Sequence, residues 1–406
     1  MKNAVQALIL ILVFFPETSL NTSLAINKDS IHSIYLYRVF GAITASDLII
    51  LFLFGFVFFR TLSRGTINFG IIAPIFYIYI VYYFLGFLYN VLVAYELKPY
   101  LFDIKAGLYL FVPYMALKEV LKDFIITESL IIKIVIIYAL GIFLDSALIQ
   151  INGGGHYVSQ INFPLILEVF PMALLLGASF LFTRKKSKYL SRIFFIFEIL
   201  SSLNRLNMGA LLAAILSLIW LFIVKIRLSF SFMIGSMVLI YYSVYVFAMN
   251  VIIFIPNPLM KFKSHGWEIR KIELYNFLEN SIINFPILIG KGLGTTWREV
   301  IVPSSANVYS HGPFYDSVNN FIWHNTFGGS FYKFGIIGSL LLITYLSIIS
   351  TRLLFRTRCT KNQSVGAFLS FSIPAFVMLN INGIGILKGA LISSIILFSV
   401  NHLMQE

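Results

Sequence analysis

The sequence predicts an all-α integral membrane protein with about twelve transmembrane helices and one large extracytoplasmic loop before the last three helices. The chain of 406 residues is 59% hydrophobic and only 12% charged, whereas soluble domains are usually about 45–50% apolar and about 25% charged. Its mean hydropathy is +0.89. Apolar runs long enough to cross a bilayer recur along most of the chain, and one long segment, residues 253–330, interrupts them with many polar residues.

The expected membrane helices follow from segment length, because a spanning helix needs roughly 20 mostly apolar residues. The segments that come closest to this requirement are 4–20, 42–60, 69–92, 104–121, 129–148, 160–182, 189–203, 205–224, 229–252, 331–352, 364–382 and 385–402. They divide the chain into an N-terminal membrane bundle of about nine helices (1–252), an extracytoplasmic loop (253–330) and a C-terminal group of about three membrane helices (331–406).

The positions of lysine and arginine predict the orientation, since short cytoplasmic loops of membrane proteins are enriched in basic residues. With the N-terminus inside, the inward-facing segments hold more than half of the 30 basic residues, and the alternation along the chain is unbroken. Both termini are then cytoplasmic, and residues 253–330 lie outside. The same rule accounts for the net charge of +13 without a nucleic-acid partner.

Two features stand out in the outer loop. Residues 267–282 have apolar positions near helical spacing, which predicts an amphipathic helix that lies either on the membrane surface or packed within the loop. Residues 287–299 contain Gly290, Gly292 and Gly294 in alternation. This run does not follow the strand of a βαβ unit, so it is not a dinucleotide site. Consecutive N–H groups of such a turn could still cradle a phosphate.

Two arginines are candidate ligands for an anion. Arg205 interrupts an apolar region. It either extends to lipid headgroups or faces a cavity and binds an anion, for which its planar guanidinium group is well suited. Arg270 lies in the outer loop two residues after Glu268, where a surface ion pair is the alternative to a ligand role.

His324 is the leading candidate for proton transfer. It stands where the outer loop re-enters the membrane, and neutral imidazole accepts a proton near neutral pH. The alternative is an anchor at the membrane surface beside Trp323 and Tyr332, which are expected in the aromatic belt. His311 and His156, in outer segments, are further candidates.

Several catalytic motifs are missing from the sequence. It has no Asp-x-Asp pair for a metal-bound nucleotide sugar, no two histidines at metal-ligand spacing, no P-loop and no Gly-x-Ser-x-Gly. The single cysteine, Cys359, excludes an intramolecular disulfide and a cysteine metal cluster. We therefore expect neither a metal nor another cofactor.

Three stretches resemble the O-antigen polymerase and O-antigen ligase superfamily of bacterial envelope glycan assembly. Residues 204–223 are similar to its arginine followed by a small-residue start of a membrane helix. Residues 269–294 are similar to its order of arginine, short helix, proline and Gly-x-Gly. Residues 324–338 resemble its His-Asn pair, with Gly-x-x-Gly after nine intervening residues. The glycines at 153–155 follow Gln150, where the family often has an arginine.

The resemblance implies glycosyl transfer on the outer face of the bacterial cytoplasmic (inner) membrane. A glycan on undecaprenyl diphosphate would be transferred to an acceptor sugar hydroxyl, with polymerisation of repeat units into O-antigen or capsular polysaccharide as the preferred reaction. The implied roles are a catalytic base for His324 and diphosphate binding for Arg205, Arg270, Arg298 and Lys291. Contacts with the acceptor or glycan are expected from Asn325, His311, Trp323 and His156. Implied partners are the lipid-linked oligosaccharide, membrane lipids, a chain-length regulator and a flippase.

Two other functions stay open. An O-antigen ligase would use the same chemistry to move a finished glycan to a sugar of the lipid A core. A lipid-oligosaccharide flippase or another transporter belongs to a different class of protein. Transporters often consist of two similar halves with broken helices near the membrane midplane, and the sequence contains no such halves.

The predicted orientation can be tested at Ser304, in the outer loop. In a Cys359→Ser background, Ser304→Cys should react with a membrane-impermeant maleimide in intact spheroplasts, because the loop faces outward. A matched Ser187→Cys variant, in a basic segment predicted to face inward, should react only after lysis. Reaction of the Ser304→Cys variant only after lysis would contradict the orientation.

Overall fold

The computed structural model describes the parts of the chain that form a helical framework. The described residues are 2–14, 38–40, 43–66, 68–92, 97–121, 288–294, 297–298, 319–320, 326–357, 365–370 and 386–405, with single positions at 130, 133, 134, 137, 189, 235, 360, 363 and 373. Apart from two pairs of very short antiparallel strands, the described elements are helical.

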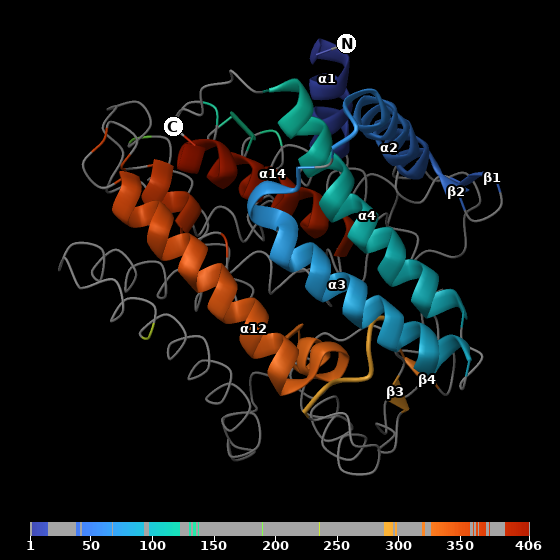
Figure 1. The fold of residues 1–406 in the computed structure, drawn as a ribbon. Helices are drawn as coiled ribbons and strands as arrows, with labels where there is room; N and C mark the ends of the chain where they lie inside the picture. The colour runs from blue at the N-terminus through green and yellow to red at the C-terminus, as the bar shows by residue number, and fades with distance from the viewer. Residues whose placement is uncertain are drawn as a thin grey trace, which may run out of the picture.

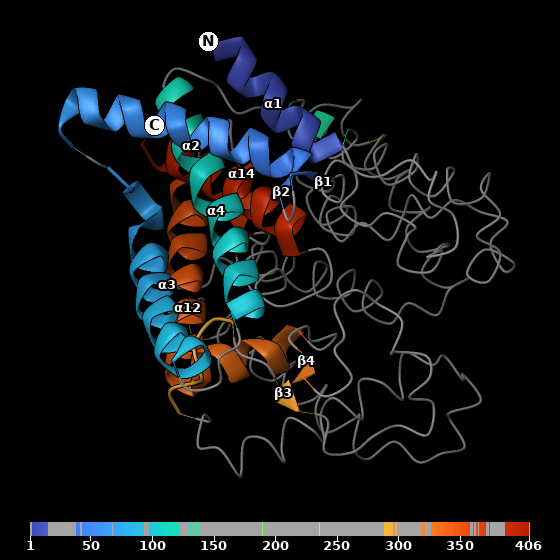
Figure 2. The same ribbon diagram turned by 90° about the vertical axis from the view of Figure 1, so that its right-hand side faces the viewer.

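A bundle of long helices forms the centre of the described structure. Helix α3 (Ala73–Gly86) lies between α4 (Leu97–Val120) and α12 (Thr326–Thr357), and the three run alongside one another in both views (Figures 1 and 2). A short 3-10 helix, η2 (Gly70–Ile72), leads into α3. The C-terminal helix α14 (Ile386–Gln405) packs mainly against α4 and also contacts α12 and η2.

Two further helices cover one end of this bundle. Helix α1 (Lys2–Phe14) contacts α4 and α14, while α2 (Ala45–Arg64) runs obliquely across the bundle (Figure 2). The strands β1 (Arg38–Phe40) and β2 (Ile43–Thr44) pair antiparallel immediately before α2.

The first turn of α2 is fixed both by a cap and by contacts with α4. The Thr44 hydroxyl accepts a hydrogen bond from the N–H of Asp47, and the Asp47 carboxylate accepts one from the N–H of Thr44. The same carboxylate lies 2.8 Å from Lys105 Nζ and accepts a hydrogen bond from the Tyr109 hydroxyl at 2.9 Å. At the other end, Gly65 closes the helix with a left-handed φ of 67°.

Four of the described helices are long and apolar enough to cross a membrane, and they indicate a membrane protein. These helices are Ala45–Arg64, Gly70–Tyr89, Tyr100–Val120 and Tyr332–Thr357. They overlap the segments predicted at 42–60, 69–92, 104–121 and 331–352. These four predicted helices are confirmed as long apolar helices, because the length of an apolar run is itself the physical requirement for spanning a membrane.

The start of α4 differs from the prediction. The helix begins at Leu97 rather than at 104, because hydropathy alone gives little weight to turns that contain Lys98, Asp103 and Lys105. Asp103 and Lys105 both have ion-pair partners in the structure, so their charges are compensated and the helix extends through them.

The remaining predicted spans are described unevenly. Segment 385–402 corresponds to α14, and segment 4–20 overlaps α1, whose 13 described residues give a helix of about 20 Å. Segments 129–148 and 364–382 are described only in part. The segments outside the described residues, apart from single positions, are 160–182, 189–203, 205–224, 229–252 and the amphipathic helix at 267–282. The count of about twelve helices and the division into 1–252, 253–330 and 331–406 therefore stay predictions.

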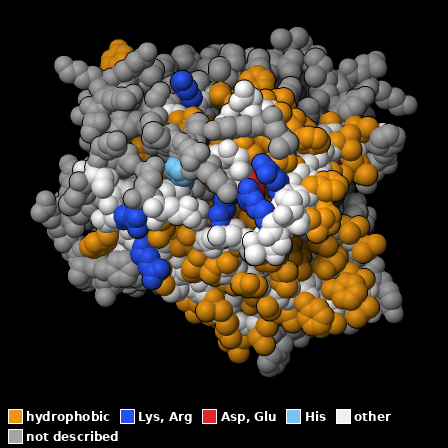
Figure 3. Space-filling model, turned by 45° about the horizontal axis from the view of Figure 1, so that its top comes forward, with side chains coloured by type: hydrophobic (Ala, Val, Ile, Leu, Met, Phe, Trp, Pro, Cys, Tyr) orange, Lys and Arg blue, Asp and Glu red, His pale blue; other side chains and the backbone are white. Residues whose placement is uncertain are grey.

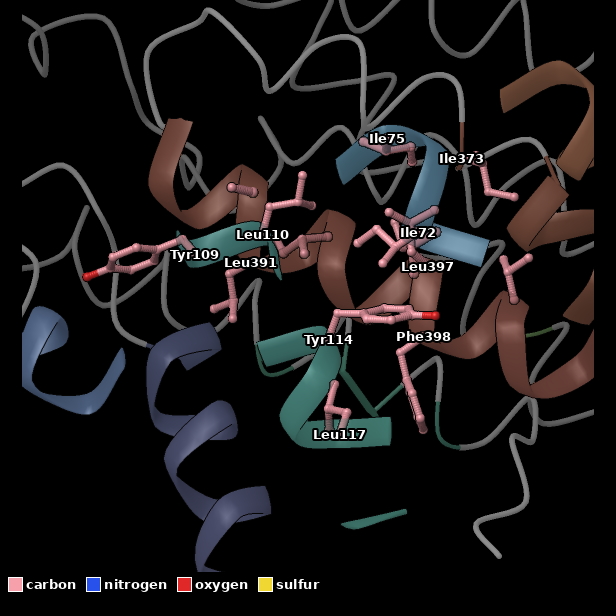
Figure 4. Packing of buried hydrophobic residues seen from close by; sticks show 14 of the residues in the cluster. Ile72, Ile75, Tyr109, Leu110, Tyr114, Leu117, Ile373, Leu391, Leu397 and Phe398 are labelled. Carbon is pink, nitrogen blue, oxygen red and sulfur yellow. The ribbon is translucent and has the colours of Figure 1, made fainter. Parts of the chain in front are cut away.

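The largest contact between the described helices is that of α4 with α14 (Figure 4). Leu110 and Tyr114 of α4 lie next to Leu391 and Leu397 of α14, and Ile72 of η2 lies beside Leu397. All five side chains are buried. Because such interiors are close-packed, the loss of even a few methyl groups should weaken the contact.

Basic side chains gather at the end of the bundle where α2, α4 and α12 finish, which we call the basic end (Figure 3). Arg64, Lys118 and Arg356 occupy the last turns of these helices, where positive charge complements the helix dipole. Arg64 pairs with Glu119, and Lys118 Nζ donates a hydrogen bond to the carbonyl of Asn68 at 2.7 Å. The last turns of α2, α4 and α12, whose basic residues the sequence assigns to the cytoplasmic side, thus lie at the same end of the bundle.

The outward faces of α2 and α3 carry large exposed apolar side chains. Among them are Phe52, Phe54, Phe58, Phe59, Tyr77, Ile80, Val81 and Phe84. In Figure 3 apolar side chains form a wide surface next to the basic end. Soluble monomers rarely expose an apolar surface of this extent, whereas lipid chains would cover it.

Truncation of Leu397 should weaken the contact between α4 and α14. Leu→Ala changes in soluble cores cost about 2–5 kcal/mol, and we expect about 2 kcal/mol here because lipid is as apolar as the side chain that is removed. Leu397→Ala should therefore lower the thermal unfolding midpoint of the detergent-purified protein. Leu341→Ala, at an exposed position of α12, is the matched control. Equal losses in the two variants would contradict this packing.

Candidate functional site

Residues 288–294 (LIGKGLG), which we call the glycine segment, lie at the end of the bundle opposite the basic end (Figure 1). At this end α3 continues into a π-helical turn, η3 (Phe87–Val91), a feature that is frequent at functional sites. The N–H of Leu293 donates to the carbonyl of Tyr82 in α3 at 2.9 Å. The glycine segment is therefore attached directly to the backbone of the bundle.

Gly290, Gly292 and Gly294 adopt left-handed backbone conformations, with φ of 82°, 88° and 81°. Residues with a side chain rarely adopt such values. Each glycine also lies directly against other backbone, because an added Cβ would overlap α12 at Gly290, α3 at Gly292 and α4 at Gly294. Glycine is therefore required at these alternate positions for two reasons: the backbone is left-handed there, and no space exists for a side chain.

Helix α12 is interrupted at Gly335, where φ is 63° and ψ is −176°. In an unbroken helix, the N–H of Ile337 would donate to the carbonyl of Lys333. Instead it donates to the carbonyl of Leu288 at 3.0 Å, and the Lys333 carbonyl accepts a hydrogen bond from the N–H of Gly292 at 2.9 Å. The glycine segment thus supplies the hydrogen bonds that the break removes.

A buried ion pair lies beside this break. Lys333 Nζ is 2.7 Å from Asp103 Oδ2 and 2.9 Å from Oδ1, and the two side chains are only 3% and 4% exposed. Asp103 Oδ2 also accepts a hydrogen bond from the N–H of Gly294 at 2.6 Å. Charges buried to this extent need close pairing and further hydrogen bonds to offset their lost hydration. The pair joins α4, α12 and the glycine segment at one point.

Lys291 is a predicted diphosphate ligand whose side chain is described. Its Nζ lies 4.9 Å from the centre of the Tyr89 ring and 5.0 Å from the centre of the Tyr332 ring. Both distances are typical of cation–π contacts. The backbone N–H of Lys291 donates to the carbonyl of Tyr332 at 2.9 Å, and the residue is 9% exposed. The ammonium group is therefore held between aromatic rings of η3 and α12.

The strands β3 (Trp297–Arg298) and β4 (Asn319–Asn320) pair antiparallel at the same end of the bundle (Figure 2). Arg298, another predicted diphosphate ligand, lies opposite Asn319 in this pair. The strand β3 closely follows the glycine segment along the chain, and β4 shortly precedes α12. The pairing therefore brings together two stretches that lie within the predicted outer loop.

The other predicted site residues lie outside the described part of the chain, and their roles stay predictions. They are His324, Asn325, Trp323, His311, His156, Arg205 and Arg270. In the sequence, His324 stands two residues before the first residue of α12.

Two interpretations of the sequence are wrong. Tyr332, expected in the aromatic belt, is 1% exposed, and its ring lies against the ammonium group of Lys291. The glycine turn, considered as a phosphate cradle, uses the N–H groups of Lys291, Gly292, Leu293 and Gly294 for acceptors within the protein. Its backbone holds the segment in place instead.

Asp103 and Lys333 are the residues that sequence reasoning missed. A signal for both was present, because a charged residue within an apolar membrane segment is by default a candidate for function. Their partnership could not be seen, since the two residues are separated by 230 positions. The pattern of a single sequence does not show which distant charges meet.

The described part of the site is a frame of backbone hydrogen bonds and one buried ion pair. The Asp103 carboxylate is neutralised by Lys333, and the Lys291 ammonium group is held by ring faces. Two of the predicted site residues are close to this frame in the sequence, with Arg298 shortly after the glycine segment and His324 just before α12.

Comparison of the chain with protein-family models, with curated proteins and with solved structures finds no match.

The glycine segment should not tolerate a side chain at Gly292. A left-handed conformation at a non-glycine residue costs about 1–3 kcal/mol, and an added Cβ would also overlap the backbone of Gly86. Gly292→Ala should lower the thermal unfolding midpoint in detergent. Gly55→Ala, on α2, is the control because nothing lies within 4 Å of its added Cβ. A Gly292→Ala variant as stable as the Gly55→Ala variant would contradict the close approach.

Proposed function

We propose that this chain is a membrane glycosyltransferase that polymerises undecaprenyl-diphosphate-linked oligosaccharide repeat units into O-antigen or capsular polysaccharide. The reaction takes place on the outer face of the bacterial cytoplasmic membrane and uses no metal ion or nucleotide sugar. The alternative with the same chemistry is an O-antigen ligase, which differs in its acceptor, a sugar of the lipid A core.

The observation that carries the proposal is the contact between two stretches that resemble the polymerase and ligase superfamily. Residues 269–294 end in the glycine segment, and residues 324–338 contain the break in α12. The two stretches are joined by backbone hydrogen bonds from Gly292 to Lys333 and from Ile337 to Leu288. The described ends of two stretches that resemble one family are therefore in contact, which supports the proposal that the stretches act together.

The proposed chemistry is a displacement at the anomeric carbon of the lipid-linked glycan. The acceptor hydroxyl oxygen forms the new bond to this carbon, and His324 takes the hydroxyl proton. The bond from the carbon to the diphosphate oxygen breaks, and undecaprenyl diphosphate leaves with the electron pair. Arg205 and Arg270, with Arg298 and Lys291 as further ligands, stabilise the charge that develops on the diphosphate.

In this proposal the chain has about twelve membrane helices, cytoplasmic termini and an outer loop at 253–330. The proposed orientation is supported by the distance between the basic end and the glycine segment, which lie at opposite ends of the bundle (Figure 1). If the basic end faces the cytoplasm, the glycine segment faces the outer surface, where lipid-linked repeat units would be used.

A transporter is the alternative from another class, and the break in α12 is the feature that would favour it. In transporters, broken helices expose backbone groups that bind the substrate or a coupling ion. Here the carbonyls of Tyr332 and Lys333 accept hydrogen bonds from Lys291 and Gly292. These two groups are therefore engaged within the protein, and the break gives no support to transport.

Loss of His324 should slow glycosyl transfer while leaving the protein folded. A general base contributes typically 10²–10⁴-fold to a rate, so His324→Ala should lower polymerisation by about 100-fold or more per folded molecule. The measurement uses purified protein and synthetic lipid-linked repeat units. His402→Ala, on α14 near the basic end, is the matched control. An anchoring role would instead lower abundance and leave turnover per molecule near normal, which would exclude the base.

The two arginines should be needed for their shape as well as for their charge. Arg205→Lys and Arg270→Lys keep the charge but lose the planar fork, so each should reduce activity without abolishing it. Arg205→Ala and Arg270→Ala should lose most activity at normal protein levels. Arg356→Ala, in the last turn of α12 at the basic end, is the control. Glycan chains of full length from either Ala variant at position 205 or 270 would exclude diphosphate binding there.

A further inference from the structure

Asp103 is the residue through which α4 contacts both α12 and the glycine segment. One oxygen of its carboxylate, Oδ2, contacts Lys333 Nζ at 2.7 Å and the N–H of Gly294 at 2.6 Å. Lys333 lies two residues before the break at Gly335, and Gly294 lies three residues before β3. A single side chain on one helix thus contacts the second helix and the segment that leads to Arg298.

We propose that Asp103 is a positioning residue for glycosyl transfer. Its ion pair with Lys333 and its hydrogen bond from the N–H of Gly294, which we together call the lock, hold the glycine segment against α12. The lock thereby fixes the start of the chain that leads to β3, the strand that contains Arg298. The choice of reaction rests on the proposed function, whereas the lock itself rests on the geometry.

The lock differs from the surrounding backbone hydrogen bonds. Those bonds join main-chain groups that repeat along the chain, so similar bonds would re-form if the segment slid along α12. The Asp103 carboxylate is fixed on α4 and meets the N–H of one residue, Gly294. A slide by one residue would also place Leu293 where space exists only for glycine. The ion pair and the alternating glycines therefore specify a single alignment.

The test removes the ion pair of the lock without leaving an unpaired buried charge. Asp103→Asn combined with Lys333→Met deletes both charges, because removal of one partner alone is strongly destabilising. The matched control is Asp47→Asn combined with Lys105→Met, which deletes another ion pair of α4 (2.8 Å) away from the glycine segment. Thermal unfolding midpoints show whether each double variant is folded.

Two readouts separate alignment from stability. Alignment is measured by the rate of disulfide formation between Leu288→Cys and Ile337→Cys in a Cys359→Ser background, because these residues share a backbone hydrogen bond of 3.0 Å and both are exposed. Catalysis is measured as kcat/KM with synthetic undecaprenyl-diphosphate-linked repeat units. The first readout needs no enzymatic activity.

We expect the Asp103→Asn/Lys333→Met variant to form the disulfide more slowly. Its kcat/KM should fall by about 100-fold, since a misplacement of about 1 Å can cost that much. The Asp47→Asn/Lys105→Met control should match the wild type in both readouts. If the first variant matches the wild type in kcat/KM, the positioning role is overturned, and an unchanged disulfide rate overturns the lock as well.

If the protein is not a polymerase, the two readouts would give a different pattern. In that case the wild type would not polymerise the repeat units, and the disulfide rate alone would decide on the lock. If the Asp103→Asn/Lys333→Met variant does not fold, Asp103→Glu provides the second test, because it keeps the charge and changes its reach by one methylene. Wild-type values of both readouts in Asp103→Glu would then overturn the proposal.

Discussion

Every N–H and C=O group inside a membrane protein needs a partner within the protein, since lipid offers none. The break of α12 at Gly335 would leave such groups without partners. The glycine segment meets this requirement, because Ile337 donates to Leu288 and Lys333 accepts from Gly292. The two parts of the chain therefore depend on each other. The break in α12 is tolerated because the glycine segment provides hydrogen-bond partners, and the glycine segment is held in place by the backbone groups that the break leaves available.

The same requirement explains which residue types occur at this end of the bundle. Backbone can approach three helices this closely only if alternate residues lack a side chain, and positions 290, 292 and 294 are glycine. The alternating glycines already resist a slide by one residue, and a contact that does not repeat along the chain specifies the alignment further. The buried pair of Asp103 and Lys333 provides this contact, at the cost of removing two charges from water. Lys291 adds a second cation, held by aromatic rings.

The sequence was sufficient to predict the parts of the fold that depend on local composition. The segments 42–60, 69–92, 104–121 and 331–352 overlap described membrane helices because an apolar run of sufficient length is both the signal and the physical cause. The pairing of Asp103 with Lys333, the break at Gly335 and the burial of Tyr332 could not be predicted, since each depends on a partner far away in the sequence. The roles of His324, Arg205 and Arg270 stay predictions, because these residues lie outside the described part of the chain.

The most direct test of the proposed function is a reaction of the purified wild-type protein with one synthetic undecaprenyl-diphosphate-linked repeat unit, in the presence of a metal chelator and without nucleotide sugars. The proposed polymerase should convert the repeat unit into a ladder of lipid-linked oligomers and release one undecaprenyl diphosphate for each bond formed. Transfer to a lipid A core acceptor without a ladder would identify a ligase and contradict polymerisation. Movement of the repeat unit across vesicle membranes without any new glycosidic bond would contradict glycosyl transfer altogether.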